Sequence, residues 1–263
     1  MISTSAENAA GDERLAAATV KIHDAFQNYE RARQKQFQTN FDIVCFYADL
    51  GIDYYVPLLE KLTASARAVM PGVRLVLLSP SKVPGFDVTV PMPKAGEADI
   101  CYRRAEALAS WGSYSPRASV FVDADLEFRS FPQFGDWDIG LMWRRNPAQP
   151  INSGMILARP QQKEFWASYL RIAYSLPKPF RAWWGDQLPF SLMTGVFNKP
   201  GDEMDIGGSK IKLLEMDRLC PKSDRPHPEA WALHYKGTRR KKSGDGTFSP
   251  ESVTSTATDT EPS

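Results

Sequence analysis

Ser119-Val-Phe-Val-Asp-Ala-Asp-Leu-Glu-Phe128 joins a short apolar run to two acids that a single alanine separates. Residues 120–122 have the β-branched and aromatic character of a buried strand. If the strand ends there, the carboxylates of Asp123 and Asp125 stand at a sheet edge and can point the same way. Such a pair suits Mg²⁺ or Mn²⁺, which prefer oxygen ligands and often bind substrate phosphates as well. A solvated turn is the alternative interpretation of the same two acids.

The segments before this stretch alternate between strand and helix patterns. Strands are predicted at residues 42–47, 73–78 and 88–90, and helices at residues 54–69 and 98–111. Nearly continuous apolar strands are typical of a parallel sheet that is covered on both faces. We therefore predict an α/β fold with a Rossmann-like mixed, mostly parallel sheet flanked by helices. Ligands of such sheets bind outside the carboxyl ends of the strands.

The second half of the chain is less regular. Strands are predicted at residues 138–143 and 151–158, and helices at residues 161–175 and 183–194. The remaining segments up to residue 233 are rich in Gly, Pro and Asp and give no clear pattern. The chain shows no internal repeat.

Length and composition predict one large domain with a less ordered segment at each end. The chain has 263 residues, of which 43% are hydrophobic. Residues 1–40 are expected to contain a flexible start and an amphipathic helix at residues 12–38, which packs on the domain or pairs with a copy of itself. Residues 41–240 would form the domain. Residues 241–263 contain almost no apolar side chains and are expected to be disordered.

Charge and cysteine usage exclude several classes of protein. The 32 basic residues nearly balance the 31 acidic ones, so no global field favours nucleic acid. Cys45, Cys101 and Cys220 are widely spaced and form no Cys-x-x-Cys motif, which predicts reduced thiols. The sequence has no apolar run long enough for a membrane span and no basic–apolar leader. We expect a soluble, cytoplasmic protein.

Five short motifs follow one another in the proposed domain. They are Asp42-Ile-Val-Cys-Phe-Tyr-Ala-Asp49, Asp123-Ala-Asp125, Asn152-Ser-Gly-Met-Ile-Leu157, Gly185-Asp-Gln187 and His234-Tyr-Lys-Gly237. In order and spacing they resemble the motifs of GT-A fold nucleotide-sugar glycosyltransferases, most closely the retaining enzymes of glycosyltransferase family 8. The resemblance covers residues 42–240. It implies transfer of a hexose from a nucleotide-diphosphate sugar, a uridine diphosphate (UDP) sugar, to a saccharide or other hydroxyl acceptor.

The resemblance implies that the first motif grips the base and ribose of the donor through Ala48, Asp49 and Tyr54. An ordinary strand-to-helix loop with a capping acid is the alternative. Arg104 matches an arginine that contacts the donor in similar proteins, and Arg103 is its rival. A surface arginine on an amphipathic helix is the other interpretation of Arg104.

For the acid pair, the resemblance implies a Mn²⁺ or Mg²⁺ ion that bridges the donor diphosphate. Asp123 and Asp125, the DxD motif, would bind the ion with His234 as third ligand, and the imidazole favours manganese. His234 could otherwise be a packed strand residue. Gly237 and Arg240 match residues that hold the diphosphate, but the family usually ends this motif with Lys-Pro-Trp.

A basic run replaces this ending, so any of three cations could be the residue that contacts the diphosphate. They are Lys236, Arg239 and Arg240, and the run could instead be a solvated basic tail.

The remaining motifs correspond to the reacting sugar and the acceptor. Asn152 opens a predicted strand and is matched to the nucleotide-sugar site, although Asn and Gly also favour hairpin turns. The resemblance implies that Asp186 and Gln187 lie under the reacting carbon, and Asp186 would be the general base if the enzyme inverts. Trp183 and Trp184 could stack on sugar faces. The alternatives are a helix start over buried tryptophans and, for the whole chain, a non-catalytic nucleotide- or glycan-binding protein.

Overall fold

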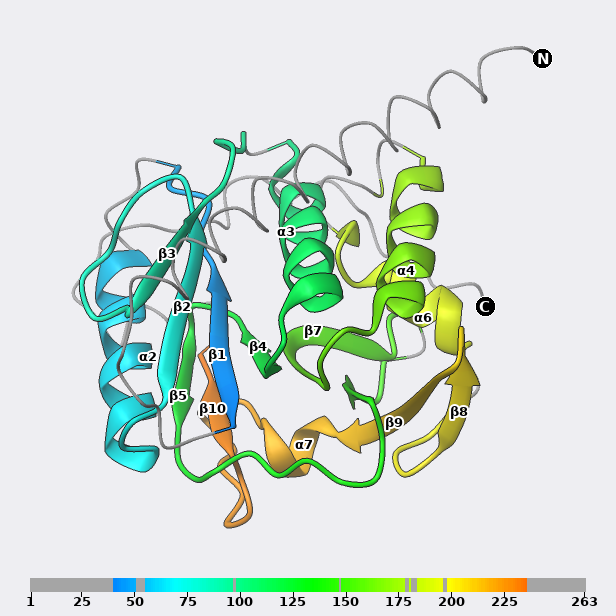
Figure 1. Ribbon diagram of the computed structural model, residues 1–263. Helices are drawn as coiled ribbons and strands as arrows, with labels where there is room; N and C mark the ends of the chain where they lie inside the picture. The colour runs from blue at the N-terminus through cyan, green and yellow to red at the C-terminus, as the bar shows by residue number, and fades with distance from the viewer. Residues whose placement is uncertain are drawn as a thin grey trace, which may run out of the picture.

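The computed structural model describes residues 40–50, 55–96, 98–146, 148–177, 180, 184–195 and 198–235. The predicted helix at residues 12–38 and the predicted tail at residues 241–263 lie outside these ranges. Figure 1 shows the described residues as one sheet with helices packed on it. Within them, no helix is long and apolar enough to cross a membrane.

The described residues form an eight-stranded sheet in the order β3-β2-β1-β4-β7-β6-β9-β8. The strands are β1 (Phe41–Phe46), β2 (Arg74–Ser79), β3 (Val88–Pro91), β4 (Ala118–Val122), β6 (Ile139–Trp143), β7 (Ile151–Ala158), β8 (Glu203–Ile206) and β9 (Ser209–Glu215). β3, β2, β1 and β4 are parallel, β7 runs antiparallel between β4 and β6, and β9 is parallel to β6. The predicted mixed, mostly parallel sheet is confirmed.

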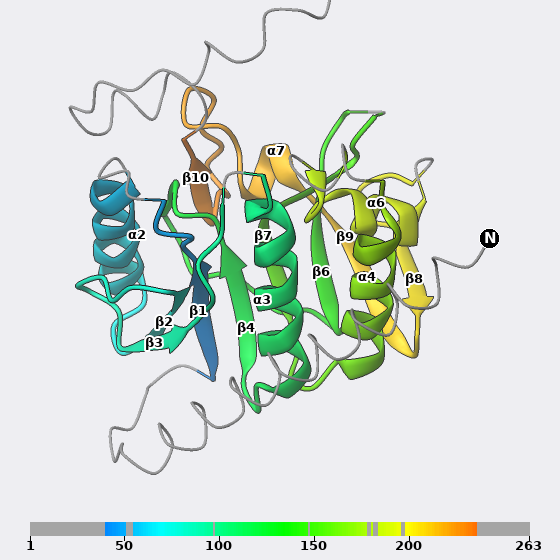
Figure 2. The same ribbon diagram turned by 90° about the horizontal axis from the view of Figure 1, so that it is seen from above.

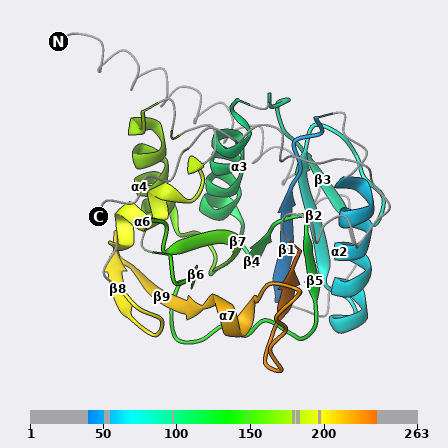
Figure 3. The same cartoon turned by 180° about the vertical axis from the view of Figure 1, so that it is seen from behind.

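Both faces of the sheet are covered, but by different elements. The helices are α2 (Tyr55–Val69), α3 (Ile100–Tyr114), α4 (Lys163–Ser175), α6 (Leu188–Thr194) and α7 (Met216–Leu219), and a small second sheet pairs β5 (Leu126–Phe128) with β10 (Ala232–His234). Figure 2 shows α3 and α4 side by side on one face, with α6 next to α4. Figure 3 shows α2, β5, β10 and α7 on the other. The two coverings leave the carboxyl ends of the parallel strands at one edge.

Alternating side chains along each strand build the two halves of the core. Val44 and Phe121 pack toward α3 and α4, whereas Ile43 and Val120 pack toward α2 and β5. All four side chains are fully buried, as the apolar strand patterns indicated. The three cysteines are free thiols, which confirms that prediction.

The nine elements predicted between residues 42 and 175 are present, with ends shifted by a few residues, but the second half of the chain required two corrections. The predicted helix at residues 183–194 was wrong in its first part, because residues 185–187 form a turn and α6 begins at Leu188, next to Pro189. The segment without a clear pattern contains β8, β9, α7 and β10. Positive φ angles at Gly207 and Gly208 make the tight turn between β8 and β9.

A buried ion cluster joins three strands at their amino ends, opposite the edge that carries the predicted ligand site. Asp42 on β1 is fully buried and accepts hydrogen bonds from Arg74 Nε (2.8 Å) and Nη2 (2.5 Å) and from Arg117 Nε (2.8 Å). Arg74 stands opposite Asp42 in the β1–β2 register, and Arg117 immediately precedes β4. The cluster therefore fixes the alignment of β1, β2 and β4.

Asp42→Asn should destabilise the fold strongly, because it removes the carboxylate that pairs with the buried guanidinium of Arg74. We expect a loss of about 3–5 kcal/mol in the free energy of unfolding, measured by urea denaturation. The matched control is Asp136→Asn, which removes an exposed partner of Lys210 and should leave the unfolding curve almost unchanged. Equal curves for the two variants would contradict this role for the cluster.

Candidate functional site

The acid pair follows the carboxyl end of β4, as predicted. The backbone N–H of Asp123 donates a hydrogen bond to the carbonyl oxygen of Gly154 on β7 (2.8 Å), which ties the first acid to the neighbouring strand. Residues 124–125 form a turn that leads into β5. The Asp123 side chain is 30% exposed, whereas Asp125 is buried. The end of β4 therefore presents one accessible and one buried carboxylate.

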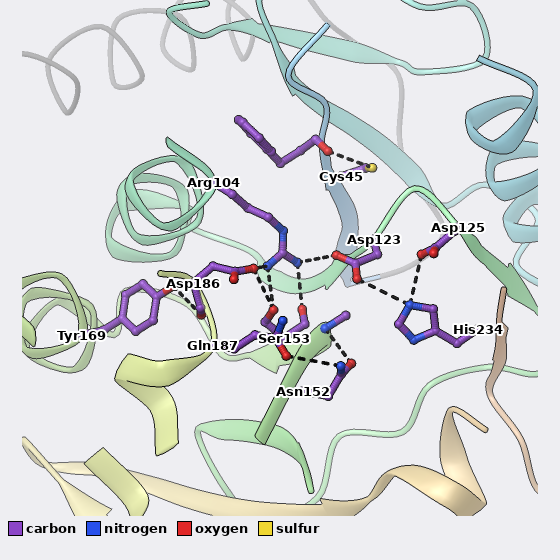
Figure 4. A network of polar contacts seen from close by, with 12 residues as sticks. Cys45, Arg104, Asp123, Asp125, Asn152, Ser153, Tyr169, Asp186, Gln187 and His234 are labelled. Atoms are coloured by element: carbon purple, nitrogen blue, oxygen red, sulfur yellow. Dashed lines mark hydrogen bonds and ion pairs between the residues drawn. The ribbon is translucent and has the colours of Figure 1, made fainter. Parts of the chain in front are cut away.

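His234 lies against both acids. The antiparallel pairing of β10 with β5 places His234 opposite Leu126, directly after Asp125. Its Nε2 atom is 3.1 Å from Asp125 Oδ1 and 3.5 Å from Asp123 Oδ2, and the imidazole is fully buried (Figure 4). One possible ligand atom from each of the three residues lies within 4.8 Å of the other two. The structure thus brings together the three residues that the sequence suggested as metal ligands.

These three side chains fit a divalent cation in chemistry and in spacing. Two carboxylate oxygens and an imidazole nitrogen are suitable ligands for Mn²⁺. An octahedral ion with ligands at about 2.1 Å keeps neighbouring ligand atoms about 3 Å apart, which is close to the distances found here. Gly154 borders the same space, because a Cβ at this position would lie 2.5 Å from His234 Cε1 and 2.9 Å from Asp123 Oδ2. Glycine is therefore required if both side chains are to keep their positions.

A polar cluster holds the strand that carries His234. The hydroxyl of Tyr235 donates to Glu127 Oε2 (2.5 Å), and Lys61 Nζ lies 2.7 Å from the same oxygen and 4.0 Å from the centre of the tyrosine ring. The backbone N–H of Tyr235 also donates to the carbonyl oxygen of Asp125 (2.9 Å). Although burial opposes the charge, the contacts with Lys61 and Tyr235 lower the pKa of Glu127. The end of β10 is thus fixed to β5 and α2.

Arg104 on α3 contacts the first acid and joins it to a third carboxylate. Its Nη2 atom lies 2.8 Å from Asp123 Oδ1, and its Nη1 atom donates to Asp186 Oδ2 (2.5 Å). The guanidinium also donates to the hydroxyl (2.9 Å) and the carbonyl (2.8 Å) oxygens of Ser153. Burial disfavours the charge of Arg104, but Asp123 and Asp186 outweigh this effect and raise its pKa. Arg104 is a permanent, rigidly held cation beside the acid pair.

Arg103, the alternative candidate for the donor contact, pairs with other acids. It pairs with Asp99 (3.2 Å) and Glu106 (2.8 Å) on its own helix. Successive helix positions differ in direction by about 100°, so only one of two adjacent arginines can face the site.

Asp186 is held in the turn before α6 by side chains from three other elements. Its Oδ2 atom accepts hydrogen bonds from Arg104 and from the hydroxyl of Ser153 (2.9 Å), and its backbone carbonyl accepts one from the Tyr169 hydroxyl on α4 (2.9 Å). Burial raises the pKa of the Asp186 carboxyl and Asp123 adds to the shift, whereas Arg104 opposes it. Two carboxylates, those of Asp123 and Asp186, thus contact one guanidinium, and Asp125 lies beside Asp123 at His234; this excess of acids favours a cation.

Asn152 and Gln187 lie next to each other, and Asn152 contacts Gly154. Asn152 Oδ1 accepts from the Gly154 N–H (3.0 Å), and Asn152 Nδ2 donates to Gln187 Oε1 (3.5 Å). The same Gln187 oxygen accepts from Arg144 Nη2 (3.3 Å). The predicted site residues Asn152 and Gln187 are therefore in contact. Arg144, which was not predicted, completes the group.

The first motif forms a loop after β1 at the same edge. Ala48 is buried, and Asp49 has a positive φ of 50°, a conformation that aspartate tolerates better than most residues. The Asp49 carboxylate accepts hydrogen bonds from Tyr47 Oη (3.4 Å) and from the Ser81 hydroxyl after β2. Tyr54 lies outside the described residues. The role of these residues in binding a donor stays a prediction.

The cations expected near the diphosphate follow the last described residue. Lys236, Gly237, Arg239 and Arg240 lie outside the described part of the chain, as does Trp183. Trp184 is described and is 41% exposed.

Three residues of the site were not predicted from the sequence. Ser153 lies inside a motif that was singled out, but its hydroxyl carried no signal of its own. Tyr169 lies in the predicted helix at residues 161–175, and its hydroxyl carried no signal of its own. Arg144 directly follows β6, a strand parallel to β4, so its place at a carboxyl strand end is the signal that could have identified it.

Comparisons with known proteins support the fold. No protein-family model matches this sequence, and no curated protein does. A solved structure that matches is described as the crystal structure of a glycosyltransferase involved in the glycosylation of the major capsid of PBCV-1. It shares 15% identity with a TM-score of 0.51, and the match covers 78% of this chain and 97% of that one. The chain therefore shares the fold of that structure.

If Asp123, Asp125 and His234 hold a divalent cation, Gly154→Ala should weaken that binding about 10–100-fold, because the new methyl group displaces His234 or Asp123. Titration of the nucleotide-free protein with Mn²⁺, followed by electron paramagnetic resonance, measures the affinity.

The matched control for this titration is Gly96→Ala. A Cβ at Gly96 has only Asp99 Oδ1 nearby, at 3.6 Å, so this variant should bind Mn²⁺ as the wild type does. A folded Gly154→Ala variant with unchanged affinity would show that the ion does not bind beside Gly154.

Proposed function

We propose that the protein is a metal-dependent glycosyltransferase that transfers a hexose from a nucleotide-diphosphate sugar, a UDP-sugar, to a saccharide or other hydroxyl acceptor. The observation that carries this proposal is the cluster of Asp123, Asp125 and His234 at the carboxyl end of β4, beside the buried cation Arg104. A glycosyltransferase fold with this cluster at its ligand-binding edge supports sugar transfer more than any other chemistry we considered.

The proposed ligands of the ion are Asp123, Asp125 and His234, with Mn²⁺ favoured and Mg²⁺ as the alternative. When bound, such an ion would neutralise the negative charge that grows on the leaving diphosphate. Asp123 has the most exposed side chain of the three, so it is the residue best placed to contact the nucleotide sugar as well.

The network around Arg104 would keep the donor side of the site rigid. Asp186 and Ser153 hold the guanidinium from one side, so Arg104 cannot turn away from Asp123 when a substrate arrives. A cation fixed in advance stabilises developing negative charge without the cost of reorganisation. Asp186 and Gln187 are the residues that we assign to the reacting sugar, with Asn152 orienting Gln187.

We propose that transfer retains the anomeric configuration. An inverting enzyme needs a general base that faces the acceptor, and the Asp186 carboxyl is buried, with its Oδ2 atom already engaged by Arg104 and Ser153. This engagement favours a positioning role for Asp186 and supports front-face transfer, in which the leaving phosphate helps to deprotonate the acceptor. Proton NMR of the first product formed tests the configuration, and an inverted anomer would contradict it.

The other donor contacts in the proposal come from the motifs at the two ends of the domain. Ala48, Asp49 and Tyr54 would bind the base and ribose. Gly237 and Arg240 would hold the diphosphate.

A panel of nucleotide sugars tests the function directly. The protein is incubated with Mn²⁺ and each donor, and release of the nucleoside diphosphate is followed. We expect slow hydrolysis with at least one UDP-sugar, lost on chelation with EDTA and restored by Mn²⁺. A folded protein that binds UDP but releases none from any donor would instead be a nucleotide- or glycan-binding protein.

Asp125→Ala should abolish metal-dependent release of UDP without unfolding the protein, because it removes a buried ligand of the proposed ion. The control Asp136→Ala changes an exposed acid remote from the cluster and should keep full activity. Turnover and circular dichroism are measured on both. Activity retained in a folded Asp125→Ala variant would overturn the site assignment.

A further inference from the structure

Arg144 follows the carboxyl end of β6, and only uncharged groups hold it. Its Nε atom donates to the backbone carbonyl of Gln149 (2.8 Å) and its Nη2 atom to the Gln149 side-chain oxygen (2.5 Å) and to Gln187 Oε1 (3.3 Å). The side chain is half-buried. These contacts fix one edge of the guanidinium fork, formed by Nε and Nη2, and none of them involves Nη1.

No carboxylate of the described residues lies within ion-pair distance of Arg144. The other buried or half-buried arginines in the described ranges differ, because Arg74, Arg103, Arg104 and Arg117 each pair with an acid. A guanidinium taken partly out of water without a partner is costly. Burial accordingly lowers the pKa of Arg144, and the more distant charge of Asp186 only partly opposes this.

The side chain of Gln149 also has a donor group without a hydrogen-bond acceptor. Its side-chain oxygen faces Arg144, so its amide nitrogen must face the other way. That nitrogen is buried and has no hydrogen-bond acceptor among the described residues. The group formed by Arg144 and Gln149 therefore has fewer acceptors than donors. An anionic ligand would supply acceptors and charge at once.

The position of Arg144 relates it to the proposed transfer site. Gln187 connects Arg144 to Asn152, and Asn152 borders the same Gly154 space as Asp123. Arg144 is thus two hydrogen bonds from the residues that border the proposed cation site. Trp184, whose carbonyl accepts the backbone N–H of Gln187 (3.0 Å), exposes an aromatic face in the same turn.

We propose that Arg144 binds a carboxylate or phosphate group on the acceptor, so that the acceptor is an acidic saccharide or a sugar phosphate. This inference rests on the proposed function and names its second substrate. The Nη1 atom keeps two N–H donors that none of these contacts uses, and a carboxylate or a phosphate oxygen can accept charge-assisted hydrogen bonds from them. The neutral partners Gln149 and Gln187 hold the guanidinium in place without cancelling its charge.

The test measures binding of three sugars by NMR titration in the presence of Mn²⁺ and UDP, and again without them. The probes are methyl glucoside, methyl glucuronoside and glucose 6-phosphate, which are neutral, carboxylated and phosphorylated. Wild-type protein should bind at least one anionic sugar about tenfold or more tightly than the neutral one. Comparison of the two anionic probes shows which anion is preferred.

Three variants complete the test. Arg144→Gln should lose the preference for the anionic sugar, and Arg144→Lys should restore part of it by returning the charge without the fork. Arg145→Gln, which changes the exposed neighbouring arginine, should keep the full preference.

The proposal is overturned if wild-type protein binds no anionic sugar, if it binds the three probes equally, or if the preference survives Arg144→Gln. UDP binding in the presence of Mn²⁺ is measured separately on each protein. If the wild type does not bind UDP, the proposed function is contradicted. If it still prefers an anionic sugar when no nucleotide is present, the Arg144 site is supported.

Discussion

The salt bridges of Arg104 to Asp123 and Asp186 are the interactions on which the rest of the site depends. They join the end of β4 to the turn before α6, and Ser153 on β7 closes the group (Figure 4). Removal of Arg104 would leave the Asp186 carboxylate without its cation in a buried medium that solvates charge poorly. The network therefore holds its members in one arrangement, and it sets Asp123 beside the Asp125–His234 pair.

The charged residues at the two ends of the sheet have different roles. At the amino ends, the single carboxylate of Asp42 pairs with both Arg74 and Arg117 and so ties three strands together. At the carboxyl ends, the acids outnumber the cations around Arg104, while the partners of Arg144 among the described residues are neutral. The pairs at the amino ends stabilise the fold, whereas the unbalanced charges of opposite sign at the carboxyl ends suit a cation at one point and an anion at another.

Backbone geometry supports this division. The small sheet of β5 and β10 has no large core of its own, yet it brings His234 to the acid pair, and Glu127, Lys61 and Tyr235 hold it there. Gly154 supplies the space that the three proposed ligands share. A glycine and a three-residue strand thus contribute as much to the proposed metal site as the carboxylates themselves.

Sequence patterns alone determined the sheet of the first half, the place of the acid pair at a strand end, and the residues now found around it. Strand and helix periodicities are local, so residues 42–122 carried them in full. The hairpin of β8 and β9 was missed, although charged and apolar residues alternate along β9 as in a half-buried strand and Gly207-Gly208 marked its turn. Only the tertiary structure decided that Arg104, not Arg103, meets Asp186, 82 residues away, and that Arg144 stands beside Gln187. Contacts between such distant residues depend on the order of strands in the sheet, which no local pattern encodes.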